Sequence, residues 1–235
     1  MAVPEEIVVL AGGFGTRLRD VVSDVPKPLA PVRGRPFLAY LLDAFAQQKL
    51  RRVIFATGYM GEVLPEALGR TWRGMDLVYV RESEPLGTGG AIAHAAASIM
   101  GDAFFVANGD TFLSLDYAAF AQFSAAHSVE IGVALANVPD VGRYGAVEID
   151  GARIERFREK GGSGPGFINA GTYYVRCAAL TAFPPARKFS FETDVLATMT
   201  GSGRMAGFTS THDFIDIGVP EDYRRSPVCL GVESA

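Results

Sequence analysis

Hydrophobic and polar positions along the first half of the chain follow two alternating patterns. Short apolar or β-branched runs predict buried strands at 7–10, 52–57, 76–80 and 103–107. Apolar residues at helical spacing predict helices over 37–50, 88–100 and 116–127. Because strands and helices alternate, we expect βαβ units in an α/β fold, a Rossmann-like three-layer sandwich with a mainly parallel mixed sheet.

The pattern changes after residue 128. Strand-like segments follow at 129–136, 145–149, 153–157, 167–175 and 204–210, with one helix predicted over 191–200. Asp150-Gly151, between two of these segments, is a good hairpin turn. We therefore expect a single domain over 1–235, in which an antiparallel elaboration at about 129–225 covers a ligand bound by the half at about 1–128.

Composition and charge are those of an ordinary globular chain. Its 235 residues carry a net charge of −4 and no densely basic stretch, which argues against a nucleic acid as partner. Cys177 and Cys229 are far apart, so we expect reduced thiols rather than a disulfide or a metal site. The acidic N-terminus and the short apolar run at 7–10 suit neither a signal peptide nor a membrane span, and we expect a cytoplasmic protein with no membrane partner.

A glycine-rich loop follows the first predicted strand, where ligands bind in parallel sheets. Gly12, Gly13 and Gly15 would let backbone N–H groups approach a phosphate closely. Thr16 adds a hydroxyl donor, and Arg17 adds a cation with fork geometry. An ordinary strand-to-helix turn would explain the glycines alone equally well.

Two better-known phosphate motifs do not fit this loop. Leu18 stands where a dinucleotide fingerprint needs its third glycine, and the Gly-Lys-Ser/Thr ending of a P-loop is missing. Downstream, Lys27 lies between Pro26 and Pro28, which restrict the backbone on both sides. A pre-organised ammonium suits a site where charge develops on a phosphoryl group. Pro-Lys-Pro alone usually marks a surface loop, but its combination with the glycine loop is far more specific.

Residues 10–18 (Leu-Ala-Gly-Gly-Phe-Gly-Thr-Arg-Leu), followed by 26–29 (Pro-Lys-Pro-Leu), resemble the signature of nucleotidyltransferases that make nucleotide sugars. The resemblance continues in order through 84–90, 108–110, 143–145, 159–160, 169–171 and 214–218. Residues 23–28, 188–192 and 214–223 look most similar to the guanylyltransferases acting on D-glycero-α-D-manno-heptose 1-phosphate. The resemblance implies a GT-A-like fold, a nucleotide-binding first half, a sugar-phosphate-binding second half, and release of pyrophosphate.

The resemblance also implies roles for individual residues. The implied catalytic residues are Arg17, Lys27, Asp110 and Asp216. The implied nucleotide-binding residues are Leu10, Ala11, Gly12, Gly13, Gly15, Thr16, Arg17, Lys27, Glu82, Gly87 and Thr88. The implied residues for the sugar phosphate are Gly145, Glu159, Lys160 and Asn169. In this scheme Arg17 binds the leaving pyrophosphate, Lys27 stabilises the α-phosphoryl charge, and Lys160 holds the incoming sugar phosphate.

Asp110 and Asp216 are the candidate metal ligands. Either residue alone could be a strand-end turn former or a helix cap. Together, in a protein expected to bind a triphosphate, two carboxylates suit Mg²⁺, which prefers few carboxylates, several waters and phosphate oxygens. The resemblance implies that this pair holds Mg²⁺ as the cofactor.

The residues themselves offer candidates for binding the base. Gly87, Gly89 and Gly90 would let the backbone approach a flat base, and Glu82 or Glu84 could accept from guanine N–H groups. Both glutamates could equally be solvated surface charges. The likeness favours GTP as the nucleoside triphosphate and the heptose as the sugar 1-phosphate, while the residues alone do not separate a heptose from a hexose.

Other functions stay open at this point. A uridylyl- or thymidylyltransferase, or a guanylyltransferase acting on mannose or glucose 1-phosphate, would keep the mechanism and change the pockets. A non-catalytic nucleotide-sugar sensor would not need the complete set of cations and carboxylates. Many relatives carry a C-terminal β-helix domain, and we expect none here because the chain ends soon after Asp216. The expected product would supply a surface polysaccharide such as a capsule, and a homo-oligomer stays open.

Overall fold

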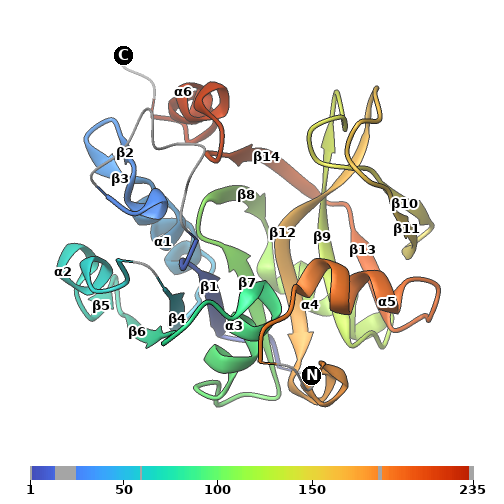
Figure 1. The fold of residues 1–235 in the computed structure, drawn as a ribbon, viewed down its shortest axis with the longest axis horizontal. Coiled ribbons are helices and arrows are strands. Elements are labelled where there is room, and N and C mark those ends of the chain that lie inside the picture. Colours follow the sequence, from blue (N-terminus) through green and yellow to red (C-terminus); the bar gives the residue numbers. More distant parts are fainter. Residues whose placement is uncertain (1, 14–24, 59, 185–186, 233–235) are drawn as a thin grey trace.

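The computed structural model describes residues 2–13, 25–58, 60–184 and 187–232, which build a ten-stranded sheet (Figure 1). The first half of the chain supplies β1 (Glu6–Leu10), β4 (Arg52–Thr57), β5 (Thr71–Trp72), β6 (Met75–Arg81) and β7 (Ala103–Asn108). The second half supplies β9 (Ile131–Val138), β10 (Val147–Asp150), β11 (Arg153–Phe157), β12 (Gly166–Arg176) and β13 (Met205–Phe208). The strand order is β10-β11-β13-β9-β12-β7-β1-β4-β6-β5, so both halves share one sheet.

The centre of the sheet is parallel, as the alternation of strands and helices predicts. β1 pairs in parallel with β4 and β7, and β4 pairs in parallel with β6. Neighbouring residues of β1 face opposite sides: Ile7 and Val9 join one buried cluster, whereas Val8 joins another. Strands buried on both faces are continuously apolar for this reason.

Helices cover both faces and complete the three layers. One face is covered by α1 (Phe37–Gln47), α2 (Val63–Leu68) and α4 (Tyr117–Ala126). The other face is covered by α3 (Gly87–Ala96), the π-helix η3 (Glu192–Leu196) and the short α5 (Ala197–Met199). The predicted helix over 191–200 is therefore π-helical in its first part, and the helix predicted over 88–100 ends at Ala96.

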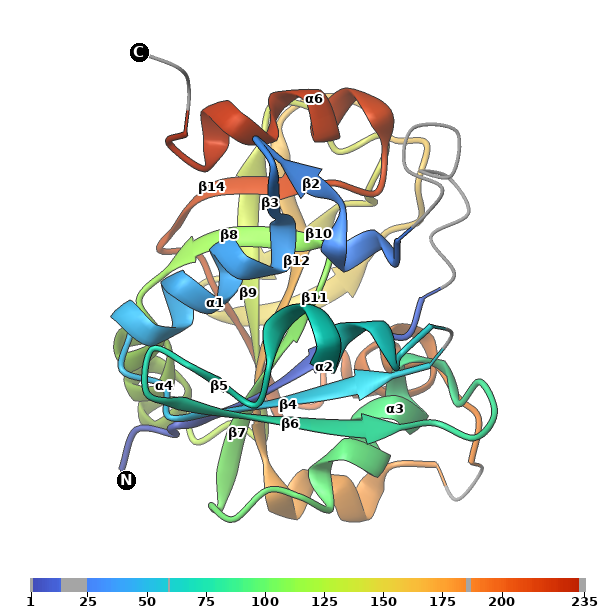
Figure 2. The same cartoon turned by 90° about the vertical axis from the view of Figure 1, so that its left-hand side faces the viewer.

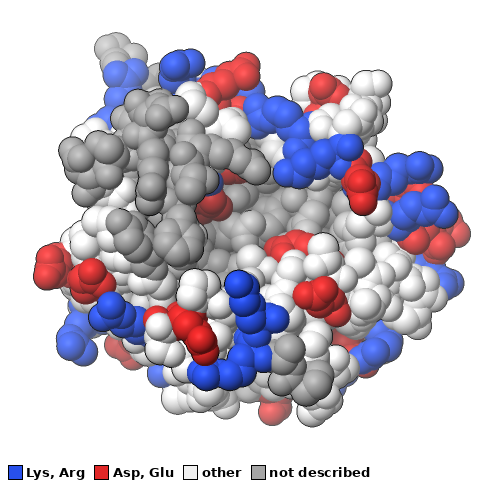
Figure 3. Space-filling view, in the orientation of Figure 1, with Lys and Arg blue, Asp and Glu red and all other residues white. Residues whose placement is uncertain are grey.

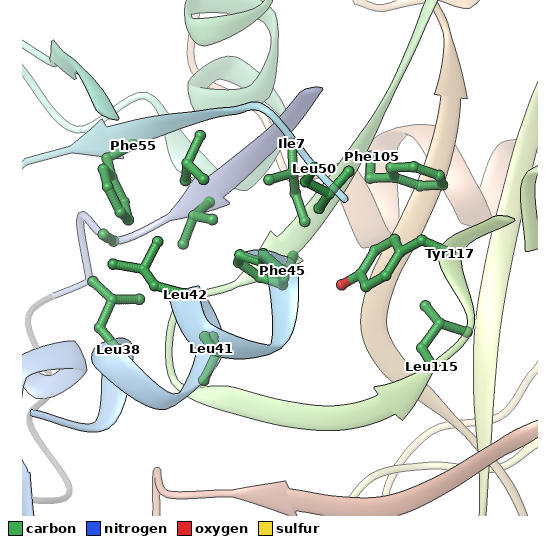
Figure 4. Close-up of a cluster of buried hydrophobic side chains, with 14 of the residues drawn as sticks. Ile7, Leu38, Leu41, Leu42, Phe45, Leu50, Phe55, Phe105, Leu115 and Tyr117 are labelled. Atoms are coloured by element: carbon green, nitrogen blue, oxygen red, sulfur yellow. The ribbon is translucent and has the colours of Figure 1, made fainter. Parts of the chain in front are cut away.

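The apolar residues that are spaced along α1 at helical intervals point into the buried cluster beneath this helix. Figure 4 shows Leu41, Leu42 and Phe45 of α1 among the apolar side chains of this cluster. The Tyr117 ring meets Phe105 edge-on at 4.8 Å between centroids and Phe45 at 5.9 Å. Edge-to-face pairs of this kind add to the stabilisation that burial alone provides.

The second half is mostly antiparallel. β12 pairs antiparallel with β7 and β9, and β13 then runs parallel to β9. β10 and β11 form the predicted hairpin, with Gly151 at φ +56 directly after Asp150. Glycine adopts this left-handed conformation without steric cost.

Smaller elements lie beside the carboxyl ends of the parallel strands. β8 (Thr111–Leu115) pairs antiparallel with β14 (Thr211–Asp216), and α6 (Pro220–Cys229) follows, as Figure 2 shows. The short 3₁₀ helix η1 (Lys27–Leu29) precedes a ribbon of β2 (Pro31–Val32) and β3 (Arg35–Pro36), and a second 3₁₀ helix, η2 (Cys177–Ala182), follows β12. Within the described ranges, no helix is long and apolar enough to cross a membrane.

Candidate active site

A cleft of about 360 Å³ lies at the carboxyl ends of the parallel strands. Figure 3 shows a hollow near the middle of this face of the molecule, with acidic side chains at its edge. The lining residues come from segments far apart in the sequence: Leu10, Ala11, Gly12, Gly13, Lys27, Pro28, Ala56, Glu82, Pro85, Gly87, Thr88, Ala91, Asn108, Asp110 and Glu192. The position agrees with the general rule that open α/β sheets bind ligands beyond the ends of their strands.

Backbone hydrogen bonds join the loops that form the cleft floor. The Gly109 N–H donates to the Leu10 carbonyl at 2.9 Å, which fixes the loop after β7 against the end of β1. A Cβ at Gly109 would lie 2.8 Å from that carbonyl oxygen, so this close approach requires glycine. Asp110, the next residue, is thereby held at the cleft.

Lys27, Asp110 and Asp216 meet at one end of the cleft. The Lys27 ammonium donates to Asp110 Oδ2 and lies 3.6 Å from Asp216 Oδ1. Lys27 is only 15 % exposed at its side chain, and the two carboxylates are about one-third exposed. Antiparallel pairing of β14 with β8 sets Asp216 opposite Thr111, which explains how a carboxylate from near the C-terminus reaches Asp110.

The backbone around Lys27 has little freedom. The Leu29 N–H donates to the Pro26 carbonyl at 2.8 Å, and the Ala30 N–H donates to the Lys27 carbonyl at 3.0 Å. Pro28 is buried beneath this turn. The ammonium is thus presented from a fixed 3₁₀ turn, which agrees with the restriction that two flanking prolines predict.

The carboxylate pair is electrostatically strained. Burial raises the pKa of Asp216, the nearby Asp110 carboxylate raises it further, and Lys27 opposes the shift. The Gly218 N–H donates to Asp216 Oδ1 at 2.6 Å and also favours the charged form. Among the residues that the structure describes, no cluster of three or more His, Cys, Asp or Glu could hold a metal ion.

Glu82 and Gly12 form the opposite end of the cleft. Glu82 is half-buried, and its Oε2 accepts from the Leu86 N–H at 3.0 Å. Burial raises the pKa of Glu82 despite that hydrogen bond. A Cβ at Gly12 would lie 3.0 Å from the Gly58 nitrogen and 3.4 Å from Glu82 Oε1, so Gly12 permits two loops to touch.

Most of the predicted nucleotide-binding residues line this cleft. They are Leu10, Ala11, Gly12, Gly13, Lys27, Glu82, Gly87 and Thr88. Gly15, Thr16 and Arg17 lie outside the described residues.

Gly89 and Gly90, in the first turns of α3, pack closely against residues 187–191. The Gly89 N–H donates to the Phe189 carbonyl at 3.1 Å, and a Cβ at Gly89 would overlap the Phe189 ring. A Cβ at Gly90 would overlap the Arg187 carbonyl oxygen. Both glycines are buried and neither is among the residues that line the cleft, so packing against residues 187–191 accounts for them without a bound base. Gly87 does line the cleft, with φ +71.

Gly145, Glu159 and Lys160 lie together on two adjoining loops. Gly145 is buried with φ +85, and a Cβ there would overlap the Arg158 carbonyl oxygen. Glu159 and Lys160 are exposed. None of the three belongs to the residues that line the cleft of about 360 Å³. The structure brings them to one another, and their part in binding a sugar phosphate stays a prediction.

Asn169 lies at an irregularity in β12, where the pairing with β9 shifts register. Its Nδ2 donates to the Tyr173 hydroxyl at 2.9 Å, and its Oδ1 accepts from the Gly171 N–H at 3.0 Å. Gly171 has φ +70 and packs directly on Asn108, which lines the cleft. The Asn169 side chain therefore makes its hydrogen bonds within the bulge of β12, beside the cleft.

Two residues of this region were missed from sequence. Glu192 lines the cleft, although residues 188–192 had been noted only for their likeness. Asp222 is buried at the start of α6, where it accepts from Arg143 and, at 3.2 Å, from the Tyr144 hydroxyl. From the sequence alone, each of these two side chains would be predicted to be an ordinary surface carboxylate.

The sheet is a mixed α/β sheet, and its cleft lies at the strand ends, where open sheets of this class bind their ligands. The family model described as "Nucleotidyl transferase" matches residues 6–227, and the chain belongs to this family. The expectation of a nucleotidyltransferase fold is thereby confirmed.

Individual relatives cover nearly the whole chain. The D-glycero-alpha-D-manno-heptose 1-phosphate guanylyltransferase of Aneurinibacillus thermoaerophilus is 37% identical over 221 residues, which are 94% of this chain and 96% of that protein. The crystal structure of HddC from Yersinia pseudotuberculosis complexed with GMP-PN has a TM-score of 0.86 and 37% identity, over 97% of this chain and 99% of that one. The mannose-1-phosphate guanylyltransferase of Mycobacterium tuberculosis is 34% identical over 96% of this chain and 64% of that protein.

Proposed function

We propose that this chain transfers a guanylyl group from GTP to D-glycero-α-D-manno-heptose 1-phosphate and releases pyrophosphate. The observation that carries the proposal is a lysine ammonium held against two carboxylates at the end of a nucleotide-sized cleft. The base and the sugar rest on likeness to a heptose 1-phosphate guanylyltransferase over 94% of the chain. The predicted cytoplasmic location and surface-polysaccharide role belong to the same proposal.

The reaction needs no covalent intermediate. A phosphate oxygen of the sugar 1-phosphate forms a bond to the α-phosphorus of the triphosphate, and the bond from that phosphorus to the oxygen bridging the α- and β-phosphates breaks as pyrophosphate leaves. The attacking oxygen is already anionic near neutral pH, because the second pKa of a phosphate monoester is about 6. The protein therefore contributes positioning and stabilisation of charge rather than a general base.

Lys27 is the cation best placed for this task. Its ammonium is mostly shielded from solvent and lies on a rigid turn, so it needs little reorganisation as charge builds up on the α-phosphoryl group. Arg17 is proposed to bind the pyrophosphate and Lys160 the phosphate of the sugar.

Asp110 and Asp216 fit a Mg²⁺ ion. Two carboxylates are enough for an ion that also takes phosphate oxygens and waters. Burial first, and the nearby Asp110 carboxylate second, raise the pKa of Asp216, and a divalent cation would favour its charged form. When bound, Mg²⁺ would neutralise charge on the phosphates, while Lys27 keeps the two carboxylates close together.

A second candidate function is guanylyl transfer to mannose 1-phosphate. The relative from Mycobacterium tuberculosis favours it, with 34% identity over 96% of this chain. Transfer to glucose 1-phosphate, uridylyl or thymidylyl transfer, and a non-catalytic sensor are further outcomes of the same test.

The test measures pyrophosphate release with Mg²⁺, each of GTP, ATP, UTP, CTP and dTTP, and a panel of heptose and hexose 1-phosphates. Release only with GTP and the manno-heptose phosphate is expected. Release with another pair would overturn the assigned base or sugar and keep the reaction. If folded protein releases no pyrophosphate with any pair, the proposed enzyme activity is wrong and a sensor takes its place.

A further inference from the structure

Glu192 is a carboxylate in the cleft for which the reaction outlined above has no use. It is half-buried at the first residue of the π-helix η3, and it lines the cleft together with Thr88 and Asn108. Thr88 Oγ1 donates to its Oε2 at 2.6 Å, and Ser190 Oγ donates to the same oxygen at 2.9 Å. Within the described part of the chain, Oε1 has no hydrogen-bond partner and is free to accept from a ligand.

The carboxylate is held in a fixed position. Thr88 Oγ1 accepts from the Phe191 N–H at 2.9 Å while it donates to Glu192, so the start of α3 and the start of η3 are tied together. Ser190 is fixed in turn, because its N–H donates to Asp194 Oδ2 at 2.8 Å. A helix cap would explain an acid at this place, but a cap would not require a side chain that lines a cleft and is held by two hydroxyl donors.

The surroundings of Glu192 suggest a part of the substrate for it. Glu82 and Gly12 touch one another in the cleft, and Lys27 and Asp110 are the residues proposed for the phosphates and the metal. Glu192 lies instead near Tyr173, whose pKa is raised first by burial and also by the Glu192 charge.

Tyr173 connects this wall to the bulge in β12. Its hydroxyl accepts from the Asn169 amide at 2.9 Å, and the bulge packs on Asn108 of the cleft through Gly171. Glu192 is therefore at the border between the nucleotide cleft and the strand that carries Asn169. In the proposed reaction the sugar phosphate meets the α-phosphoryl group beside Lys27, and Lys27 and Glu192 line the same cleft.

We propose that Glu192 is a specificity-determining residue that accepts hydrogen bonds from hydroxyl groups of the sugar. The inference rests on the proposed nucleotidyl transfer to a sugar 1-phosphate. A carboxylate is an acceptor only, so it selects a hydroxyl donor and rejects an analogue in which that hydroxyl is replaced by hydrogen. The choice of a charged acceptor makes the hydrogen bond stronger than one between neutral groups.

Steady-state kinetics of Glu192→Gln and Glu192→Ala test the proposal. The expected result is a loss of roughly 10- to 100-fold in kcat/KM for the sugar phosphate, with the KM for GTP changed less than about twofold. Glu155→Gln is the matched control, because Glu155 is an exposed carboxylate of β11 paired with Arg153, and it should behave like wild type. Melting temperatures of all variants show whether the fold is retained.

Deoxy sugars identify the contact more sharply. D-glycero-α-D-manno-heptose 1-phosphate and its monodeoxy analogues are compared in wild type and Glu192→Ala. One analogue should lose activity with wild type and lose little more with the variant, because the same hydrogen bond is already missing. Full additivity for every analogue would overturn the proposal.

Other outcomes are equally decisive. A raised KM for GTP, with the sugar KM unchanged, would assign Glu192 to the ribose or base and refute the inference. Unchanged kinetics with a lower melting temperature would make the residue structural. If wild type proves inactive, the proposed function fails separately. Calorimetric titration with D-glycero-α-D-manno-heptose 1-phosphate still tests Glu192, since equal affinities of wild type and Glu192→Gln would refute its role.

Discussion

Gly89→Ala tests whether the glycines of α3 serve packing or nucleotide binding. Gly89 lies in the first turn of α3 with ordinary helical backbone, so alanine would gain up to about 1 kcal/mol in helix propensity. The added Cβ would overlap the Phe189 ring and lie 3.1 Å from the Phe191 nitrogen. Overpacking a well-filled site typically costs about 1–3 kcal/mol.

The balance of these two terms favours destabilisation. Phe189 is only 7 % exposed and packs edge-on against Phe183, so its ring has little room to move and the cost lies toward the upper end. We expect a net loss of about 1–2 kcal/mol, which for a chain of this size lowers the melting temperature by about 2–8 °C. Displacement of residues 189–191 would also move Glu192 and raise the KM for the sugar phosphate.

The assay is thermal unfolding followed by circular dichroism, combined with KM values for both substrates. Gly162→Ala is the control, because the nearest atom to its new Cβ is Val141 Cγ2 at 3.7 Å, an ordinary contact. A surface change of this kind should stay within about 0.5 kcal/mol. If Gly89→Ala melts at or above the wild-type temperature and raises only the KM for GTP, the packing explanation is refuted.

The remaining predictions concern the carboxylates and cations. Asp110→Asn and Asp216→Asn should each nearly abolish turnover and keep the fold, which initial rates and circular dichroism would check; a variant with wild-type rates would remove that residue from the mechanism. Lys27→Met should lower kcat by about 10²–10³, as expected when one pre-organised charge contact to a transition state is lost, and an unchanged kcat would count against its role. Hydrogen bonds from Arg204, at 2.8 and 2.6 Å, lower the pKa of Glu130 below 4.5, so this carboxylate stabilises the fold above pH 4.5 and loses its effect as the pH falls through its folded-state pKa. Glu130→Gln should therefore melt below wild type at neutral pH, and the difference should shrink in acid; a difference that stays constant with pH would contradict this.

Local patterns were sufficient for much of the fold. The parallel strands are apolar runs with helices between them, and the Asp150-Gly151 turn defines its hairpin by itself. The pairing of strands that lie far apart in the sequence could not be predicted from these local patterns. β14 carries three exposed or half-exposed polar residues in Thr211–Asp213, and its partner β8 lies about a hundred residues earlier, so neither segment shows the alternation of a half-buried strand.

The same limit applied to the site. Lys27, Asp110 and Asp216 could each be chosen for their chemistry, but their meeting depends on the β8–β14 pairing and on the 3₁₀ turn that presents Lys27. Gly89 and Gly90 were assigned to the base because the sequence holds no sign that residues 187–191 pack against them. Glycines that permit contact with a ligand and glycines that permit contact with a distant segment look alike in a sequence.

One wall of the cleft links the start of α3 with the start of the π-helix η3. Thr88, next to Gly87, bonds both the Phe191 N–H and Glu192, so a shift in the start of α3 must also shift the carboxylate proposed to bind the sugar. Gly89→Ala moves this wall, whereas Glu192→Gln changes its charge and leaves its position. If both raise the KM for the sugar phosphate and only the first lowers the melting temperature, then position and charge contribute separately. Gly89→Ala could also lower stability and leave the KM for the sugar phosphate unchanged. In that case the displaced residues do not move Glu192, which is then held by Ser190 and η3 rather than through α3.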